Sequence, residues 1–355
     1  MKKILIAGGG TAGHAWPLIL IGENLLKNSQ CRLLYVGSRQ GIERKLIKNF
    51  PGIRFCPIIV GKWRAYFSFW NFYDAIKIFI GLIQAFFMII FFKPKVIFAK
   101  GGYVAFPIIF WAKFLKIALV IHESDAVLGR ANLWAAKFAS KICLGFPLES
   151  YQENLPGEKL VYTGTPVQAD FSNYADKKDH HYPKILVTGG SQGSSKINQI
   201  LWEILPRLCQ KYEIFHLAGK IDFLKFENFK NDRYHLFNFS NQMPRLMREA
   251  EIVVSRGGAN TLMEIAAAAL SSIIIPLPSA AQNHQLANAR VFEKNQAAII
   301  LLEKNLTSDL LFKEIENLVQ NQQLRQKLGH SAQKFFQKNA VSAIINIIFQ
   351  QGKDD

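Results

Sequence analysis

Short apolar runs that stop at glycine or at a polar residue recur along the N-terminal half of the chain. They cover residues 4–10 (ILIAGGG), 32–38 (RLLYVGS), 95–102 (KVIFAKGG) and 119–124 (LVIHES). Each has the length of a strand that is buried on both faces of a parallel sheet. Longer stretches of helical length lie between them, such as 17–27 and 131–139. The alternation predicts an α/β fold with a doubly wound parallel sheet.

The same pattern starts again in the C-terminal half. The similar pairs are 4–14 (ILIAGGGTAGH) with 185–195 (ILVTGGSQGSS), and 95–107 (KVIFAKGGYVAFP) with 251–265 (EIVVSRGGANTLMEI). We therefore expect two Rossmann-like domains, 1–167 and 168–337, with the polar stretch 168–184 as the linker. Apolar residues at helical spacing near the C-terminus predict a helix at about 338–355 that packs back on the first domain.

An apolar run at 78–92 (IFIGLIQAFFMIIFF) contains one polar side chain, Gln84. A transmembrane helix needs about 18 or more such residues, so we expect a buried or surface-lying helix here rather than a span. Apolar residues upstream and within the run form one helical stripe: Phe72, Ile76, Phe79 and Leu82. Aromatic and basic residues around it favour an interfacial surface facing anionic lipid, with core packing of the stripe as the alternative. These residues are Lys62, Trp63, Arg64, Tyr66, Phe69, Trp70, Lys77, Lys93 and Lys95.

The charge balance narrows the classes of partner. The chain has 355 residues, with 43 Lys and Arg against 26 Asp and Glu, a formal charge of +17. Such a balance favours anionic partners such as phosphorylated metabolites, an anionic membrane face or nucleic acid. We expect no nucleic-acid partner, because no recognition motif is present, although a basic nucleic-acid-binding module is the non-enzymatic alternative.

Cysteine usage and the N-terminal segment both fit the cytoplasm. The four cysteines, Cys31, Cys56, Cys143 and Cys209, have neither disulfide-framework nor zinc-site spacing. Glycine interrupts the first apolar run too early for a signal peptide.

The glycine-rich turns are typical of phosphate-binding sites. A strand that leads through glycines into a helix brings backbone N–H groups and the helix dipole to one place. Gly8, Gly10 and Gly13 also satisfy the dinucleotide-binding spacing, which needs an acidic residue about 20 positions further on. At that place the chain has Arg39 and no carboxylate before Glu43, so an NADP enzyme is a weaker alternative.

Six motifs in order over most of the chain resemble a known family. They are Gly9-Gly10-Thr11-Ala12-Gly13-His14, Gly101-Gly102-Tyr103, His122-Glu123, Gly164-Thr165-Pro166-Val167, Gly189-Gly190-Ser191-Gln192-Gly193 and Glu264-Ile265-Ala266. Together they resemble the membrane-associated N-acetylglucosaminyltransferases of peptidoglycan synthesis, the MurG family within glycosyltransferase family 28.

The resemblance implies a GT-B fold, in which two Rossmann-like domains face each other across a cleft. It implies inverting transfer of N-acetylglucosamine from UDP-N-acetylglucosamine to the muramyl 4-hydroxyl of undecaprenyl-diphosphate-linked N-acetylmuramyl-pentapeptide, converting lipid I to lipid II at the cytoplasmic face of the cell membrane. Cell-wall or division proteins are further expected partners. No Asp-x-Asp is present, and we expect neither metal nor cofactor. Another nucleotide-sugar transferase of the same fold, acting on a different lipid or a small molecule, is the alternative.

In the N-terminal half, the resemblance assigns residues to the acceptor side. His14 is the candidate general base, and its pKa range suits proton transfer; His122 is the second candidate. The remaining predicted contacts are Thr11, Ala12, Gly13, Tyr103, Glu123 and Asp125. Asp125 stands where the family often has asparagine.

In the C-terminal half, the resemblance assigns residues to the donor. Ser191, Gln192 and Gly193 are expected at the donor phosphates, and Glu264 at the ribose hydroxyls. Gln168 stands where many relatives carry arginine, and Ser240 matches a backbone contact to uracil. The other predicted donor contacts are Arg256, Ala259, Asn260, Thr261, Leu262, Met263, His284, Gln285 and Asn288.

Overall fold

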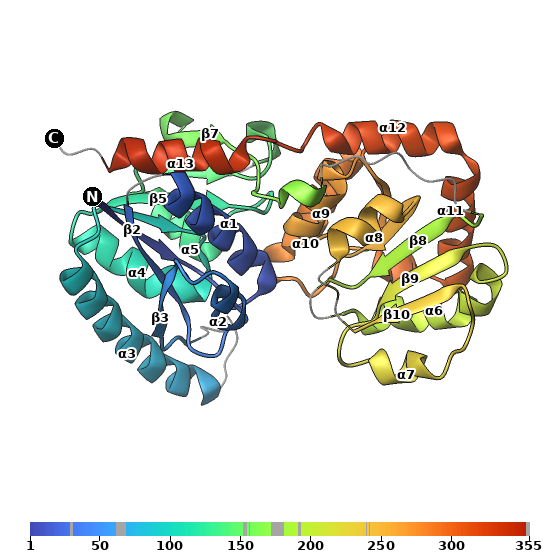
Figure 1. The fold of residues 1–355 in the computed structure, drawn as a ribbon, viewed down its shortest axis with the longest axis horizontal. Coiled ribbons are helices and arrows are strands. Elements are labelled where there is room, and N and C mark those ends of the chain that lie inside the picture. The colour runs from blue at the N-terminus through green and yellow to red at the C-terminus, as the bar shows by residue number, and fades with distance from the viewer. Residues whose placement is uncertain are drawn as a thin grey trace. The chain divides into compact units, whose positions relative to one another are not determined.

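The computed structural model describes residues 1–28, 31–61, 69–151, 155, 157–171, 181–190, 193–238, 240 and 242–352. They form two compact units, each built on its own sheet (Figure 1). Unit 1 comprises Met1–Pro166 and Asn339–Asp355, and unit 2 comprises Val167–Lys338. Every strand pairing in both sheets is parallel, with helices in the crossovers, which confirms the predicted fold class.

Unit 1 has a seven-stranded sheet in the order β3-β2-β1-β4-β5-β6-β7. Its strands are β1 (Lys2–Ala7), β2 (Cys31–Ser38), β3 (Arg54–Ile58), β4 (Val96–Ala99), β5 (Ala118–Glu123), β6 (Lys141–Leu144) and β7 (Leu160–Tyr162). Its helices are α1 (Ala12–Asn28), α2 (Glu43–Leu46), α3 (Phe69–Phe92), α4 (Gly102–Phe114), α5 (Arg130–Ala136) and α13 (Ala340–Gln351). The order reverses beside β1, so the carboxyl ends of β1 and β4 lie at the switch point where ligands of such sheets bind.

The pleat of the strands divides the core of unit 1 into two layers. Because successive side chains point to opposite faces, Leu5 and Ala7 of β1 pack with α3, α4 and α5. Ile4 and Ile6 face the other way and pack with α1 and with α13 near the C-terminus. The Nζ of Lys2 donates a hydrogen bond to the carbonyl of Phe349 at 3.2 Å, which ties the two ends of the chain together within this unit.

Helix α3 rests on unit 1 by one side and exposes the other. It is 24 residues long, and Ala85 and Ile89 on its inner side are buried. The backbone N–H of Ile59 donates to Gln84 Oε1 at 2.9 Å, and the indole N–H of Trp111 donates to the carbonyl of Leu82 at 2.7 Å. The single polar residue of the apolar run therefore anchors the helix to the protein.

Unit 2 has a six-stranded sheet in the order β10-β9-β8-β11-β12-β13. Its strands are β8 (Lys184–Thr188), β9 (Glu213–Leu217), β10 (Tyr234–Phe237), β11 (Ile252–Ser255), β12 (Ser271–Ile274) and β13 (Ile299–Ile300). Its helices are α6 (Ser195–Leu208), α7 (Phe223–Glu227), α8 (Met243–Glu249), α9 (Ala259–Ala267), α10 (His284–Lys294), α11 (Ser308–Gln320) and α12 (Gln322–Gln333).

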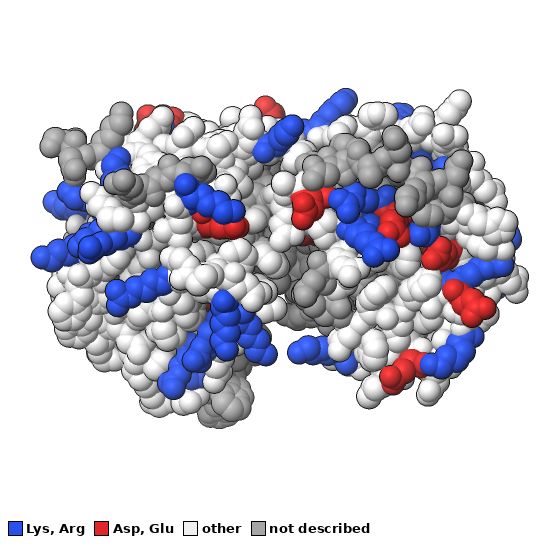
Figure 2. All heavy atoms as spheres, viewed as in Figure 1, with Lys and Arg blue, Asp and Glu red and all other residues white. Residues whose placement is uncertain are grey.

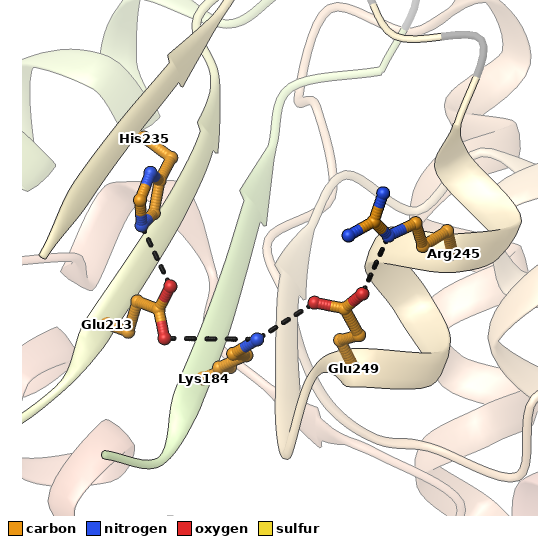
Figure 3. Close-up of polar contacts among 5 residues, drawn as sticks. All are labelled: Lys184, Glu213, His235, Arg245 and Glu249. Atoms are coloured by element: carbon orange, nitrogen blue, oxygen red, sulfur yellow. Dashed lines mark hydrogen bonds and ion pairs between the residues drawn. The ribbon is translucent and has the colours of Figure 1, made fainter. Parts of the chain in front are cut away.

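A chain of ion pairs crosses the amino edge of the sheet in unit 2 (Figure 3). Lys184, the first residue of β8, lies 2.8 Å from Glu249 of α8 and 3.9 Å from Glu213 of β9. Arg245 bonds the other oxygen of Glu249, and His235 bonds the other oxygen of Glu213, each at 2.8 Å. Because phosphate-binding turns occupy the carboxyl edge of such a sheet, this network serves stability.

Candidate active site

The first glycine turn of unit 1 is held from below by a carboxylate. Gly10 donates its N–H to Glu43 Oε2 at 2.9 Å, and Ser38 donates to Glu43 Oε1 at 2.7 Å. Glu43 is fully buried, and a Cβ on Gly9 would lie 2.2 Å from Glu43 Oε1. The carboxylate therefore occupies space that only a glycine leaves open. The sequence analysis did not predict that Glu43 holds this turn. It considered Glu43 only as a carboxylate that comes too late in the sequence to bind the ribose of a dinucleotide.

The second glycine turn of unit 1, Gly101–Gly102, places Tyr103 close to the first glycine turn and to His14 of α1. Gly101 has a φ of 72°, and a Cβ there would lie 2.4 Å from Asn132 Oδ1. A Cβ on Gly102 would lie 3.8 Å from His14 Cε1, and one on Gly10 would lie 2.6 Å from the Tyr103 hydroxyl. The segment Thr11–His14, at the start of α1, thus adjoins the turn that starts α4.

The ring of His122 is enclosed by protein. The side chain is 1% exposed; its Nε2 lies 3.0 Å from the carbonyl of Gly164 and its Nδ1 3.4 Å from the Ser124 hydroxyl. A carbonyl only accepts, so Nε2 carries the proton and Nδ1 accepts from the serine. Burial, with the nearby Lys100 ammonium, lowers the pKa of His122 to about 3. This geometry suits a positioning residue, and it gives the prediction that His122 takes a substrate proton no support.

Glu123 uses its carboxylate to organise the loop after β5. Oε1 accepts the N–H of Asp125 at 3.1 Å, and Oε2 accepts the N–H of Gly129 at 2.8 Å and the amide of Asn132 at 2.9 Å. Burial and the neighbouring charge of Asp125 raise the pKa of Glu123 to about 7. Asp125 is half-buried at the same edge. The carboxylate of Glu123 thus holds the loop that carries Asp125, and its contact with substrate stays a prediction.

Unit 2 has its own glycine turn between β8 and α6. Gly190 and Gly193 both have a φ of 81°, and Gly190 donates its N–H to Thr188 Oγ1 at 3.1 Å. Ser194 caps α6, because its hydroxyl accepts the N–H of Ile197. The turn thus directs the N-terminus of a 14-residue helix to the carboxyl edge, the arrangement that binds phosphate. The predicted donor contacts Ser191 and Gln192 lie outside the described residues.

Helix α9 carries the predicted ribose-binding carboxylate. Glu264 is half-buried, and burial raises its pKa to about 8. Within the part of the chain that the structure describes, no hydrogen-bond donor reaches this carboxylate. Asn260 and Thr261 are half-buried on the same helix, whereas the side chains of Leu262 and Met263 are buried in the core. The last two can offer a ligand only their backbone.

Several other predicted donor contacts are engaged within the protein. Arg256 is 7% exposed; its guanidinium donates to the carbonyl of Ile275 at 3.1 Å and lies 2.6 Å from Glu303. Asn288, fully buried, donates to the carbonyl of Gly257 at 3.0 Å. Both therefore support the turn before α9 rather than project from it. Ala259 is buried beside them.

The remaining predicted contacts lie nearer the surface of unit 2. Gln168 is half-buried near the start of this unit. The Ser240 hydroxyl accepts the N–H of Gln242 at 3.0 Å. Gln285 Oε1 accepts the N–H of Leu277 at 3.0 Å, and His284 Nδ1 lies 2.7 Å from the carbonyl of Ala281. The bonds of Gln285 and His284 fix the turn after β12, and among the described residues no acceptor is bonded to the amide nitrogen of Gln285.

Comparison with known proteins defines the class. The N-terminal domain of glycosyltransferase family 28 matches residues 4–144, and the C-terminal domain of the same family matches residues 184–344. The crystal structure of MurG from Acinetobacter baumannii is similar with a TM-score of 0.77 at 25% identity, covering 99% of this chain and 100% of that one. Two parallel α/β units, with the family match and this structural likeness, define a glycosyltransferase of the GT-B fold.

The sequence relatives narrow the class to a family. A protein of Clostridium botulinum, named UDP-N-acetylglucosamine–N-acetylmuramyl-(pentapeptide) pyrophosphoryl-undecaprenol N-acetylglucosamine transferase, is 38% identical over 336 residues, 90% of this chain and 92% of the relative. A relative of the same name, numbered 2, from Bacillus cereus is 35% identical over 364 residues, 98% of this chain and 99% of the relative. The chain belongs to glycosyltransferase family 28 and, within it, to the MurG family.

Proposed function

We propose that this protein transfers N-acetylglucosamine from UDP-N-acetylglucosamine to the muramyl 4-hydroxyl of lipid I, with inversion at the anomeric carbon, and so makes lipid II for peptidoglycan. The observation that carries the proposal is the 38% identity, over 90% of the chain, to a relative named for this reaction. The glycine turns of both units and the carboxylate of Glu264 supply the groups that the chemistry needs.

The donor binds unit 2 in this proposal. Glu264 faces no donor among the described residues, so its carboxylate is available to accept both ribose hydroxyls. The turn before α6 presents backbone N–H groups and the positive end of the helix dipole to the diphosphate. The same groups stabilise the charge that develops on the departing UDP.

The acceptor hydroxyl loses its proton to His14 in this proposal. His14 lies beside both glycine turns of unit 1, whereas both ring nitrogens of His122 face protein atoms. Replacement of His14 by alanine is therefore expected to lower kcat about 100-fold or more, with UDP affinity unchanged. The same substitution of His122 is expected to destabilise unit 1 instead, which a thermal melt detects.

The transfer reaction is tested with purified protein, labelled UDP-N-acetylglucosamine and alternative acceptors. Label in lipid II supports the proposal. Label in another acceptor, with none in lipid I, refutes it in favour of a different nucleotide-sugar transferase. Salt-sensitive binding of DNA without binding of UDP-sugar would instead support the nucleic-acid-binding alternative.

We further propose that α3 lies on the anionic cytoplasmic face of the membrane. Phe72–Phe92 is long and apolar enough to cross a membrane, yet only 17% of its most apolar window is buried. Of the predicted stripe, Phe72, Ile76 and Phe79 are 78%, 48% and 65% exposed and Leu82 is half-buried, so core packing does not account for its first three residues. Phe91, further along the helix, is 79% exposed. Because the opposite side of the helix is bonded to Ile59 and Trp111, an in-plane orientation keeps its contacts with unit 1.

The charge of unit 1 also favours contact of this unit with an anionic membrane. On the face drawn in Figure 2, few acidic side chains accompany the Lys and Arg residues of unit 1, whereas unit 2 mixes both signs. Lys93 and Lys95 are exposed directly after the helix. Basic side chains near an apolar helix draw it to anionic headgroups. The aromatic residues Trp63 and Tyr66 and the neighbouring Arg64, which were predicted to contribute, lie outside the described residues.

Vesicle binding tests this orientation. The double variant Phe79→Ser/Phe91→Ser is expected to bind phosphatidylglycerol vesicles at least about tenfold more weakly, because each phenyl ring contributes about 1.5–3 kcal/mol when buried. The matched control is Leu224→Ser in unit 2, where the side chain is 71% exposed. Equal binding by both variants would exclude α3 from the membrane contact.

A further inference from the structure

Lys100 is a buried cation that the fold itself does not use. It follows β4 and precedes the Gly101–Gly102 turn, and its side chain is 3% exposed. Among the residues that the structure describes, no acceptor lies within hydrogen-bonding distance of its Nζ. A buried charge without a partner costs stability that an apolar side chain of similar length would not cost. The presence of a lysine at this buried position is therefore explained better by the binding of a ligand than by the packing of unit 1.

The nearby acidic groups do not pair with this ammonium. Glu123 and Asp125 act on Lys100 only through their charge, and both oxygens of Glu123 already accept hydrogen bonds. Burial has the larger effect, and it lowers the pKa of Lys100 to about 7 against the pull of these carboxylates. The titratable groups around Lys100 and the adjoining turns are His14, Glu43, Tyr103, His122, Glu123 and Asp125.

The surroundings of Lys100 define the class of ligand. A Cβ on Gly8 would lie 3.5 Å from Lys100 Cβ, so the lysine lies against the first glycine turn as well as at the start of the second. The N-termini of α1 and α4, helices of 17 and 13 residues, begin at these two turns. Helix N-termini together with a cation attract phosphate groups. We propose that Lys100 is the cationic determinant of a phosphate-binding site in unit 1, occupied by a diphosphate of one of the two substrates.

Binding at this site is expected to take up a proton. At pH 8 much of the free protein carries Lys100 as the neutral amine, because its pKa is about 7. A bound anion stabilises the ammonium and raises that pKa, so anion binding and protonation support each other. Affinity for the anion should therefore fall as the pH rises above about 7.

The test uses inorganic pyrophosphate on the full chain, by calorimetry in two buffers of different ionisation enthalpy. Lys100→Met is expected to weaken pyrophosphate binding roughly tenfold or more and to remove its proton uptake. It is also expected to raise the melting temperature of unit 1, which loss of a structural lysine would lower. The control is Lys48→Met, which removes an equal but exposed charge in the same unit.

A second titration, with the protein saturated by UDP, identifies the source of the diphosphate. Binding that persists and depends on Lys100 assigns the site to the acceptor; binding that UDP abolishes assigns it to the donor. Unchanged pyrophosphate affinity in Lys100→Met overturns the proposal. Should that variant not fold, sulfate, which exchanges no proton near pH 8, is titrated into the unaltered chain, and absence of proton uptake overturns it.

The site rests on the proposed function only for the identity of the substrate. Lys100-dependent binding of pyrophosphate without any transfer to lipid I would refute the proposed function and leave the site standing. Transfer to lipid I, with the affinity for pyrophosphate unchanged in Lys100→Met, would support the proposed function and refute the site.

Discussion

Glu43 offers a sharp test of how the first glycine turn is held. Its carboxylate is fully buried and accepts two backbone N–H groups, from Ser38 at 2.7 Å and from Gly10 at 2.9 Å. A glutamine at this position keeps the size but replaces one acceptor oxygen with an NH₂ group. One of the two N–H groups then faces another donor inside the protein.

The expected loss of stability follows from the number of backbone N–H groups that are left without an acceptor. One buried donor left unsatisfied costs about 1–3 kcal/mol, and Glu43→Ala, which leaves two, costs about twice as much plus a cavity. For a unit of this size, 1 kcal/mol corresponds to about 2–4 °C, so Glu43→Gln should lower the melting temperature of unit 1 by about 2–12 °C. Because the turn leads directly into His14, kcat should also fall, while UDP affinity in unit 2 stays unchanged.

Differential scanning calorimetry and a transfer assay measure these effects. The control is Glu158→Gln, an exposed glutamate of the same unit, which is expected to change the melting temperature by less than about 2 °C. If Glu43→Gln melts with the parent protein and keeps its kcat, the carboxylate does not hold the turn and the reasoning fails.

Three further predictions concern other parts of the chain. Burial alone would raise the pKa of Glu249, but hydrogen bonds from Lys184 and Arg245 outweigh it and lower the pKa to about 2. The folded-state pKa is thus below the unfolded value, so the ion pairs of Figure 3 stabilise unit 2 above about pH 4.5 and are lost as the pH falls towards 2. Acid melts should show Glu249→Gln less stable by at most about 3 kcal/mol at neutral pH and equal to the parent at pH 2. Since burial raises the pKa of Glu264 to about 8, and ribose hydroxyls bond best to the ionised carboxylate, UDP affinity should rise with pH up to about 8. Calorimetry on Glu264→Gln should then show weaker binding without that dependence; an unchanged pH profile would remove Glu264 from the ribose site. Gly101→Ala should destabilise unit 1 by roughly 1–3 kcal/mol, because the φ of 72° disfavours a side chain and Asn132 occupies its place. Gly157→Ala, with nothing within 4 Å of the new methyl, is the control, and equal melting temperatures for the two would contradict this reasoning.

The strands that the sequence predicted are the interior ones. The runs at 4–10, 32–38, 95–102 and 119–124 became β1, β2, β4 and β5, which lie next to one another in the middle of the sheet. The edge strand β3 was not predicted, because its sequence RFCPI contains Pro57 and a charged residue. An edge strand is covered on fewer sides, so it needs no continuous apolar run and tolerates proline.

The sequence also left the role of α3 open for a physical reason. Its spacing predicted a helix with an apolar stripe, but a stripe that packs in a core and one that faces lipid have the same composition. Only the packing of Ala85 and Ile89 in the core of unit 1, and the bond from Ile59 to Gln84, show which side is covered. The predicted residues Phe72, Ile76 and Phe79 are on the exposed side.

The amino-acid sequence alone determined the fold class, the two-unit repeat and the places of the glycine turns. These features depend on local chemistry: apolar runs form buried strands, and glycine adopts positive φ angles in turns without a steric cost. The tertiary structure decided which polar side chains are buried and which are hydrogen-bonded within the protein. The sequence alone does not distinguish His14 from His122, or Lys100 from a lysine on the surface. Glu43 is 33 residues away from Gly10 in the sequence, yet it accepts the N–H of that residue. Burial and hydrogen-bond partners come from residues far apart in the chain, and they alone set the charge and the role of each group.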